Sequence, residues 1–257
     1  MAKLSVSETQ DYLLKDGKPF FYLADTVWMA FSNLSIPRWR DYLKFRRAQG
    51  FNAVQISILP VANDTSISEQ NDDPFLKGGD GNWDFGQLNE AYFDKAERMI
   101  EMAVEADVVP VLGVVWKCYV PGTHASRQSY IPTAMPLDAV KVYTAYIADR
   151  FERFKPIFFI SGDTSWDSDD EPMYYMAALD IVRERCPDAL ITMHLGTSRD
   201  LPEAFREKMD LYMYQSGHRP EQKTPFEVAQ KYASNEPKRP VVNGEPCYEG
   251  HGKVPTK

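Results

Sequence analysis

The chain has 257 residues, of which 44% are hydrophobic and 26% charged, so it can bury a sizeable core and is not disordered by composition. Acidic residues (37) outnumber basic ones (29), and the net charge of −8 argues against binding to nucleic acid or to an anionic membrane surface. The three cysteines have no Cys-x-x-Cys spacing, which excludes a disulfide framework and a zinc knuckle and is typical of a reducing compartment.

The N-terminal segment carries no apolar run after Met1, and the apolar runs elsewhere are too short to span a bilayer. We therefore expect a cytoplasmic protein, with a secreted mature form left open. Residues 4–14, followed by a turn at residues 15–18, have the pattern of a β-hairpin. We expect residues 1–18 to form this N-terminal hairpin.

Beyond the hairpin, short runs of β-branched and aromatic residues alternate with longer segments of helical period. The predicted strands cover residues 20–24, 53–59, 108–115, 157–161, 190–194, 211–215 and 240–244. The predicted helices cover residues 37–49, 90–106, 137–154, 173–186, 201–208 and 225–234. Several strands are apolar nearly throughout, as in a parallel sheet that is covered on both faces. No repeat or linker divides the chain, so we expect one catalytic domain over residues 1–257.

This alternation fits either an eight-stranded barrel or an open, doubly wound sheet. The open sheet usually has a glycine-rich phosphate turn after its first strand, and residues 25–28 contain no glycine. Polar and aromatic residues follow nearly every strand, so we favour an α/β fold of the TIM (β/α)8 barrel type, with the hairpin at its bottom. Only twelve residues follow Glu245. We therefore expect the barrel to be truncated at its C-terminal end, without its eighth strand and with a seam between strands one and seven.

Two acidic residues stand at the ends of predicted strands. Asp163 follows the fourth strand and Glu245 follows the seventh. Hydrolysis of a glycosidic bond uses two carboxyl groups, one that protonates the leaving oxygen and one that attacks the sugar or activates water. The pair therefore indicates a glycosidase, although either acid by itself is also compatible with a helix cap or a salt bridge at the rim.

Several longer phrases of the sequence resemble the apiosidase-type glycoside hydrolases, glycoside hydrolase family 140, within the clan of retaining TIM-barrel glycosidases. These phrases are residues 17–28, 42–55, 161–163 and 243–249. The resemblance implies that Asp163 is the catalytic acid/base and Glu245 the nucleophile of a retaining double displacement. It also implies a pectic substrate from the plant cell wall, with an apiofuranosidic bond as the candidate linkage. At its end the chain departs from the family, because the eighth strand and the C-terminal accessory domain have no counterpart.

The same strand-end positions predict residues that bind the substrate. They are Asp25, Trp28, Gln55, Trp116, Lys117, His194, Tyr214, Gln215 and, from the phrase after the seventh strand, Tyr248. A tryptophan ring can stack on a sugar, and we expect the Tyr214 phenol to donate to Glu245 and keep its carboxylate ionised. For Asp163 we expect a drier pocket near Trp166, which would keep its carboxyl protonated.

Two long segments are predicted to form walls of the site. The first covers residues 60–87, and its acidic stretch lacks the regular ligand spacing of a calcium loop. The second covers residues 119–133 and contains His124 and Arg127, which would meet the uronic acid groups of a pectic substrate.

Two other functions remain open at this point. One is a catalytically impaired, carbohydrate-binding barrel. The other is a metal-dependent sugar isomerase or amidohydrolase, which needs clustered histidine and carboxylate ligands, whereas the chain has four histidines and no His-x-His after its first strand. We expect no metal and no cofactor, and an oligosaccharide or polysaccharide as the binding partner, while the oligomeric state is left open.

Overall fold

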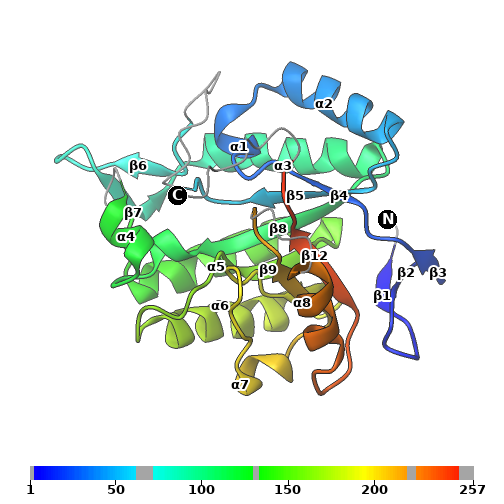
Figure 1. The fold of residues 1–257 in the computed structure, drawn as a ribbon. Helices are drawn as coiled ribbons and strands as arrows, with labels where there is room; N and C mark the ends of the chain where they lie inside the picture. Colours follow the sequence, from blue (N-terminus) through cyan, green and yellow to red (C-terminus); the bar gives the residue numbers. More distant parts are fainter. Residues whose placement is uncertain (1–2, 62–71, 130–132, 219–223, 249–257) are drawn as a thin grey trace, which may run out of the picture.

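The computed structural model describes residues 3–61, 72–129, 133–218 and 224–248, and its central feature is a series of parallel strands (Figure 1). Five strands form one parallel sheet in the order β10-β9-β8-β5-β4, and two more form the parallel pair β11-β12. An isolated parallel bridge between His194 and Met213 connects the end of β10 to β11. The strands are β4 (Ala24–Thr26), β5 (Ala53–Ser57), β8 (Val109–Trp116), β9 (Ile157–Gly162), β10 (Leu190–Thr192), β11 (Tyr212–Gln215) and β12 (Val241–Glu245). The spatial order follows the chain order, as in a (β/α) barrel, so the predicted fold class is confirmed.

The strand interiors explain why these segments form a parallel sheet. Every residue of β5, β8 and β9 is buried, as expected for strands with both faces covered. The register pairs Val115 with Ser161 and Trp116 with Gly162, so the carboxyl ends of β8 and β9 lie level with each other. This end of the strands therefore presents the residues that follow them, including Lys117 and Asp163, on one side of the molecule.

Helices pack outside the strands, and Figure 1 shows α2 and α3 on one side of the central strands and α5 and α6 on the other. Helix α3 buries Phe93, Ala96 and Ile100 at helical spacing. Helix α2 ends before Gly50, whose φ of +94° is a conformation that stops a helix. The helices are α1 (Ala30–Asn33), α2 (Ile36–Ala48), α3 (Glu90–Glu105), α4 (His124–Gln128), α5 (Leu137–Phe151), α6 (Glu171–Arg185), α7 (Glu203–Arg206) and α8 (Thr224–Ala233), with 3-10 turns at Lys117–Tyr119 and Glu152–Phe154.

The N-terminal segment forms a three-stranded antiparallel sheet rather than a simple hairpin. Its strands are β1 (Leu4–Val6), β2 (Leu13–Lys15) and β3 (Lys18–Phe20), and the turn at Asp16-Gly17 adopts positive φ at both residues. Lys15 forms an ion pair with Asp107, just before β8 begins, so this sheet lies beside the amino end of that strand. The predicted first barrel strand, residues 20–24, is corrected here, because β3 ends at Phe20 and the parallel strand β4 begins only at Ala24.

The long segment predicted as a loop over residues 60–87 contains a second antiparallel hairpin. Its strands are β6 (Phe75–Lys77) and β7 (Trp83–Leu88). Phe75 is buried and its ring meets Phe85 edge to face, with 5.1 Å between centroids. This apolar contact gives the segment structure of its own, and its residues 62–71 lie outside the described residues.

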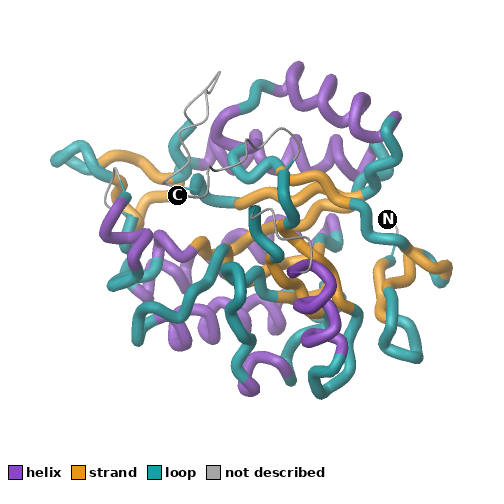
Figure 2. The backbone as a smooth tube through the Cα atoms, in the orientation of Figure 1, coloured by secondary structure: helices purple, strands orange, loops and turns teal. Residues whose placement is uncertain are grey.

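The barrel is not closed within the described part of the chain, because neither β4 nor β12 has a strand paired on its outer edge. A groove of about 480 Å³ lies between them, lined by Asp25, Arg46 and Asn243 among others. On the inner side, Gln55 Nε2 donates hydrogen bonds to Thr26 Oγ1 (2.8 Å) and to the Gly244 carbonyl (2.7 Å). One amide side chain thus bridges the predicted seam. Figure 2 shows the strands of both sheets between the flanking helices.

Candidate active site

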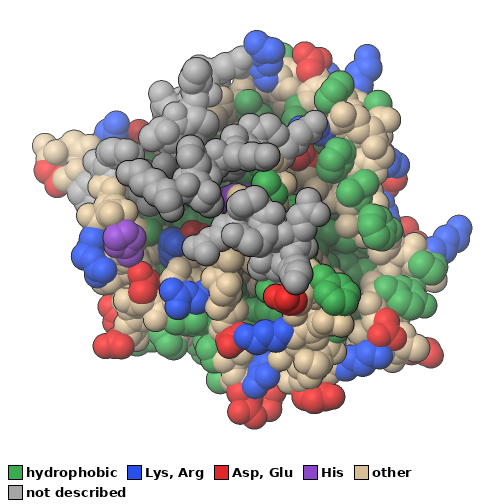
Figure 3. Space-filling model, in the orientation of Figure 1, with side chains coloured by type: hydrophobic (Ala, Val, Ile, Leu, Met, Phe, Trp, Pro, Cys, Tyr) green, Lys and Arg blue, Asp and Glu red, His purple; other side chains and the backbone are tan. Residues whose placement is uncertain are grey.

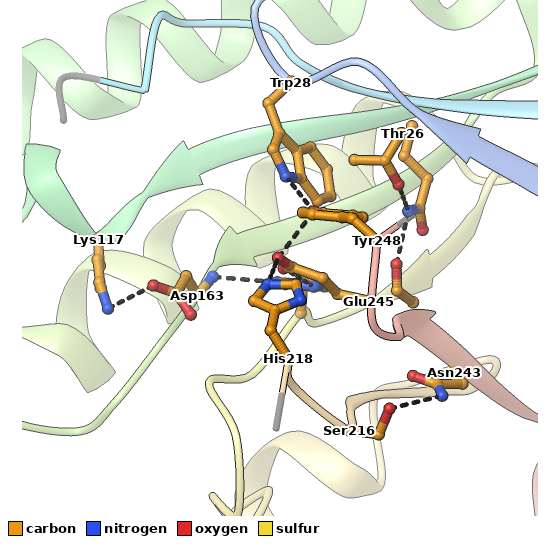
Figure 4. A network of polar contacts seen from close by, with 12 residues as sticks. Thr26, Trp28, Lys117, Asp163, Ser216, His218, Asn243, Glu245 and Tyr248 are labelled. Atoms are coloured by element: carbon orange, nitrogen blue, oxygen red, sulfur yellow. Dashed lines mark hydrogen bonds and ion pairs between the residues drawn. The ribbon is translucent and has the colours of Figure 1, made fainter. Parts of the chain in front are cut away.

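Asp163 follows β9 directly and turns its carboxylate toward the residue after β8. Its Oδ2 lies 2.5 Å from Lys117 Nζ, and about a third of the Asp163 side chain is exposed (Figure 4). The backbone of Asp163 has a φ of +55°, a left-handed conformation that is uncommon for a residue other than glycine. The neighbouring Gly162 lies under the Trp116 ring, where a Cβ atom would come within 2.0 Å of Trp116 Cε3. The absence of a side chain at Gly162 therefore lets β8 and β9 bring Lys117 and Asp163 together.

This environment of Asp163 differs from the dry pocket that we predicted. The ring of Trp166 packs against Tyr175 and Phe205, and its Nε1 donates to the Asp200 carbonyl. The nearest partner of the Asp163 carboxyl is an ammonium group instead. Asp163 thus faces a cationic side chain at the end of β8 and not an apolar pocket.

Glu245 is the last residue of β12, and its carboxylate is almost fully buried, with 6% of the residue exposed. The Tyr248 hydroxyl donates to Oε1 at 2.7 Å, and His218 Nε2 lies 3.0 Å from the same oxygen. His194 Nε2 lies 3.3 Å from Oε2. Figure 4 shows His218 and Tyr248 converging on Glu245 from two different segments.

These neighbours decide the charge of Glu245. Burial by itself raises the pKa of its carboxyl, but the contacts with His194, Tyr248 and His218 outweigh burial and hold the pKa below its ordinary value. The same carboxylate, together with burial, raises the pKa of the Tyr248 phenol far above its ordinary value, so the phenol remains a donor. Glu245 is therefore a buried carboxylate that stays ionised near neutral pH.

Aromatic rings enclose this end of the strands. Trp28 and Trp116 meet at an interplanar angle of 62° with 4.9 Å between centroids, and Trp28 Nε1 donates to the Tyr248 hydroxyl at 2.9 Å. The Trp28 and His194 rings lie 5.4 Å apart between centroids. The two tryptophans predicted for the site are thus brought together with Tyr248 and the Glu245 network.

His218 is a residue of this site that the sequence did not lead us to include. It lies three positions beyond β11, after a turn in which Gly217 adopts a φ of +75° and donates its N–H to the Glu245 carbonyl at 3.3 Å. Asn243 fixes the same turn by donating to Ser216 Oγ at 3.0 Å. We searched for site residues at the ends of the predicted strands. Extending that search to three residues beyond each strand would have included His218.

The prediction that the Tyr214 phenol holds Glu245 is wrong. The Tyr214 hydroxyl donates to the Pro225 carbonyl at 3.1 Å, and its ring stacks on Tyr232. Adjacent side chains of a strand point to opposite faces, so a phenol at this position faces α8 and not the interior. The phenol at Glu245 belongs to Tyr248, while Gln215 is buried and pairs in register with Glu245.

Three further predicted residues contact other parts of the molecule. Asp25 accepts a hydrogen bond from the Tyr42 hydroxyl at 2.7 Å and pairs with Arg46 Nε at 2.5 Å, both on α2. Arg127 donates to the Gly122 carbonyl within its own loop. The backbone N–H of His124 donates to Asp167, and its side chain is exposed. These contacts do not join the three residues to the network around Glu245.

The described residues also bear on the other functions considered. Over residues 3–61, 72–129, 133–218 and 224–248, no group of three or more histidine, cysteine or acidic side chains is arranged to hold a metal ion. In the same part of the chain, no helix has the length and apolar character needed to cross a membrane. On the face of the molecule drawn in Figure 3, acidic and basic side chains are interspersed over the described surface.

Comparison with known proteins places this geometry in context. The chain matches the family model described as "Apiosidase-like, catalytic domain" over residues 7–257. A comparison with curated proteins gives no match.

Among solved structures, a glycoside hydrolase family 5 protein from Bacteroides vulgatus is 24% identical with a TM-score of 0.75, and the match covers 96% of this chain and 54% of that one. A second structure, described as a glycoside hydrolase, is 23% identical with a TM-score of 0.75 and is covered to 57%, against 96% of this chain. A glycoside hydrolase family 5 mannosidase from Rhizomucor miehei is 10% identical with a TM-score of 0.64, over 94% of this chain and 72% of that one. The chain thus shares their fold and spans about half the length of the first two.

Proposed function

This chain belongs to the Apiosidase-like family, and we propose that it is a retaining glycoside hydrolase that cleaves a glycosidic bond by double displacement. The observation that carries the proposal is the state of Glu245, a buried carboxylate that three side chains keep ionised. A carboxylate held in this way next to a second, partly exposed carboxyl residue is the arrangement that a nucleophile and an acid/base catalyst require.

In the first step, a Glu245 oxygen attacks the anomeric carbon of the bound sugar. The bond from that carbon to the leaving oxygen breaks, and Asp163 transfers a proton to this oxygen. In the second step, Asp163 accepts a proton from water, the water oxygen attacks the anomeric carbon, and the Glu245 carboxylate is released.

Lys117 contacts the proposed acid/base residue, with 2.5 Å between its Nζ and Asp163 Oδ2. In the first step the proton must be on Asp163, and in the second step the carboxylate form of the same residue activates water.

The proposed substrate is a pectic carbohydrate of the plant cell wall with an apiofuranosidic bond. The family description supports the sugar, and the half-buried Trp28 ring, which is linked to Glu245 through the Tyr248 hydroxyl, supplies apolar surface for a sugar ring. The second candidate is a carbohydrate-binding barrel without turnover. The observation in its favour is the groove between β4 and β12, where no described strand completes the barrel.

The test is hydrolysis of aryl apiofuranosides and of pectic side chains, with proton NMR to follow the configuration of the product. We expect the product first formed to retain the configuration of the substrate. Asp163→Ala should keep activity on substrates with very good leaving groups, and added azide should accelerate its second step. Glu245→Gln should abolish both steps. Inverted product from the wild-type protein would contradict the double displacement, and binding of these sugars without turnover would support the second candidate.

A further inference from the structure

One buried imidazole contacts both residues that carry the proposed catalytic carboxyl groups. His194 Nδ1 accepts a hydrogen bond from the backbone N–H of Asp163 at 3.1 Å. Nε2 of the same ring lies 3.3 Å from Glu245 Oε2. The residue is fully buried, with 0% exposed, so its side chain acts on neighbouring protein groups and does not reach a bound sugar.

The first of these contacts fixes the tautomer of the ring. A nitrogen that accepts from a backbone N–H carries no proton of its own, so the single proton of the neutral imidazole lies on Nε2. The nearest acidic oxygen to that proton is Glu245 Oε2, 3.3 Å from Nε2, a contact without the alignment of a full hydrogen bond. One neutral ring therefore accepts from the Asp163 backbone and places its N–H dipole beside the Glu245 carboxylate.

The Asp163 backbone has particular need of such a partner. Its φ of +55° is a conformation that costs free energy in a residue with a side chain, and contacts around it must hold it in place. The backbone of His194 is itself fixed to the same strand end, because its N–H donates to the Ser161 carbonyl (3.1 Å) and its carbonyl accepts from the Thr164 N–H (3.2 Å). The imidazole thus starts from a rigid position.

The residue before the proposed nucleophile leaves room for the ring. A Cβ atom at Gly244 would lie 3.3 Å from His194 Cδ2 and 2.5 Å from Met213 Cγ. The Trp116 ring covers the imidazole at 6.0 Å between centroids and an interplanar angle of 29°. The ring is therefore confined from both sides as well as hydrogen-bonded.

We propose that His194 is the positioning residue of this site: its Nδ1 holds the backbone of Asp163, its Nε2–H holds the carboxylate of Glu245, and the neutral ring thereby sets the two catalytic groups relative to each other. This inference rests on the proposed function for the roles of Asp163 and Glu245. The tautomer, in contrast, is a property of the free protein and can be measured without a substrate.

Two substitutions separate the two contacts. Glutamine places its amide near the position of Nε2, so His194→Gln keeps a donor for Glu245 and loses the acceptor for Asp163. Asparagine places its amide near the position of Nδ1, so His194→Asn keeps the acceptor for Asp163 and loses the donor for Glu245. The probes are two aryl apiofuranosides, one with a dinitrophenyl leaving group, which needs little protonation, and one with a phenyl leaving group, which needs an acid.

For His194→Gln we expect kcat/KM to fall roughly tenfold or more further on the phenyl than on the dinitrophenyl substrate, with the acid limb of the pH profile unchanged. For His194→Asn we expect similar losses on both substrates and an acid limb that moves to higher pH by roughly one unit, the effect of one hydrogen bond to a carboxylate. The other groups that face Glu245 are His218 and Tyr248, with the Lys117–Asp163 ion pair at the same end of the strands. All of these remain in both variants.

Equal losses on both substrates with an unmoved pH profile in both variants would overturn the proposal and leave the ring a packing role. Should either variant fail to fold, nitrogen NMR of the histidines in the wild-type protein decides the point. We expect the neutral His194 ring to carry its proton on Nε2 and not on Nδ1, and a neutral ring with its proton on Nδ1 would overturn the proposal. A wild-type protein that hydrolyses neither substrate but shows this tautomer would contradict the proposed function and not the contacts of His194.

Discussion

The Tyr248 hydroxyl donates a 2.7 Å hydrogen bond to Glu245 Oε1, although Tyr248 lies beyond the end of β12 in an irregular segment. Its oxygen also accepts from Trp28 Nε1, a residue 220 positions earlier in the chain. The first and last described segments of the domain therefore meet at the carboxylate proposed to be the nucleophile. The charge of Glu245 depends on this meeting as much as on its own strand.

Removing the phenol should change the pH dependence of the reaction. The Tyr248 hydrogen bond helps to lower the pKa of Glu245, so in Tyr248→Phe the carboxyl takes up a proton at a higher pH. We expect kcat/KM to begin its fall on acidification roughly one pH unit higher than in the wild type. Tyr232→Phe is the matched control, because it removes a phenolic hydrogen bond to the Arg199 carbonyl, which is not among the contacts of Glu245. An unmoved acid limb in Tyr248→Phe would contradict the prediction.

We expect Trp28 to affect catalysis through its hydrogen bond to the Tyr248 hydroxyl. Trp28→Phe removes the donor to Tyr248 and retains an aromatic ring in the enclosure. We expect it to lower kcat/KM in the wild-type background and to have little further effect in a Tyr248→Phe background, since residues of one hydrogen-bonded network are not additive. A double-mutant cycle on kcat/KM measures this coupling. Fully additive losses would show that Trp28 acts independently of the phenol.

Gly162 should be intolerant of a side chain. A Cβ atom there would lie 2.0 Å from Trp116 Cε3, so Gly162→Ala forces the ring or the strand to move. We expect a loss of about 1–3 kcal/mol in the free energy of unfolding, as for other overpacked sites, and a Tm lower by several degrees. Gly79→Ala is the control, because a Cβ atom at Gly79 meets nothing within 4 Å. Equal Tm values for the two variants would refute this packing argument.

The seam should be visible in hydrogen exchange. Amides on the outer edges of β4 and β12 have no partner strand within the described residues, whereas β8 is paired with both β5 and β9. We expect the edge amides of β12 to exchange faster than those of β8 by orders of magnitude. Protection in β12 equal to that in β8 would show that another segment covers this edge.

Local patterns in the sequence determined the succession of strands and helices and the two strand-end acids. Runs such as residues 109–116 and 157–162 favour buried strands, because they are apolar nearly throughout and rich in β-branched and aromatic residues. Parallel strands with helical connections place their carboxyl ends on one side of the barrel. The chain order alone therefore predicts that Asp163 and Glu245 lie at the same end of the strands. The positions of both acids at strand ends needed no tertiary information.

The partners of those acids were decided by the tertiary structure. Both Tyr214 and Tyr248 are close to β12 in the expected topology. Which of them contacts Glu245 depends on the direction in which each side chain points: the Tyr248 hydroxyl reaches Glu245, whereas the Tyr214 hydroxyl donates to the Pro225 carbonyl. A shift of one residue in the register of a strand turns each side chain to the opposite face of the sheet. An irregular segment such as that of Tyr248 has no repeating pattern from which the side-chain direction can be predicted. Likewise Lys117 meets Asp163 because β8 and β9 end level with each other, a matter of register. Register and facing depend on contacts between segments far apart in the chain, and these determine the electrostatics of the site.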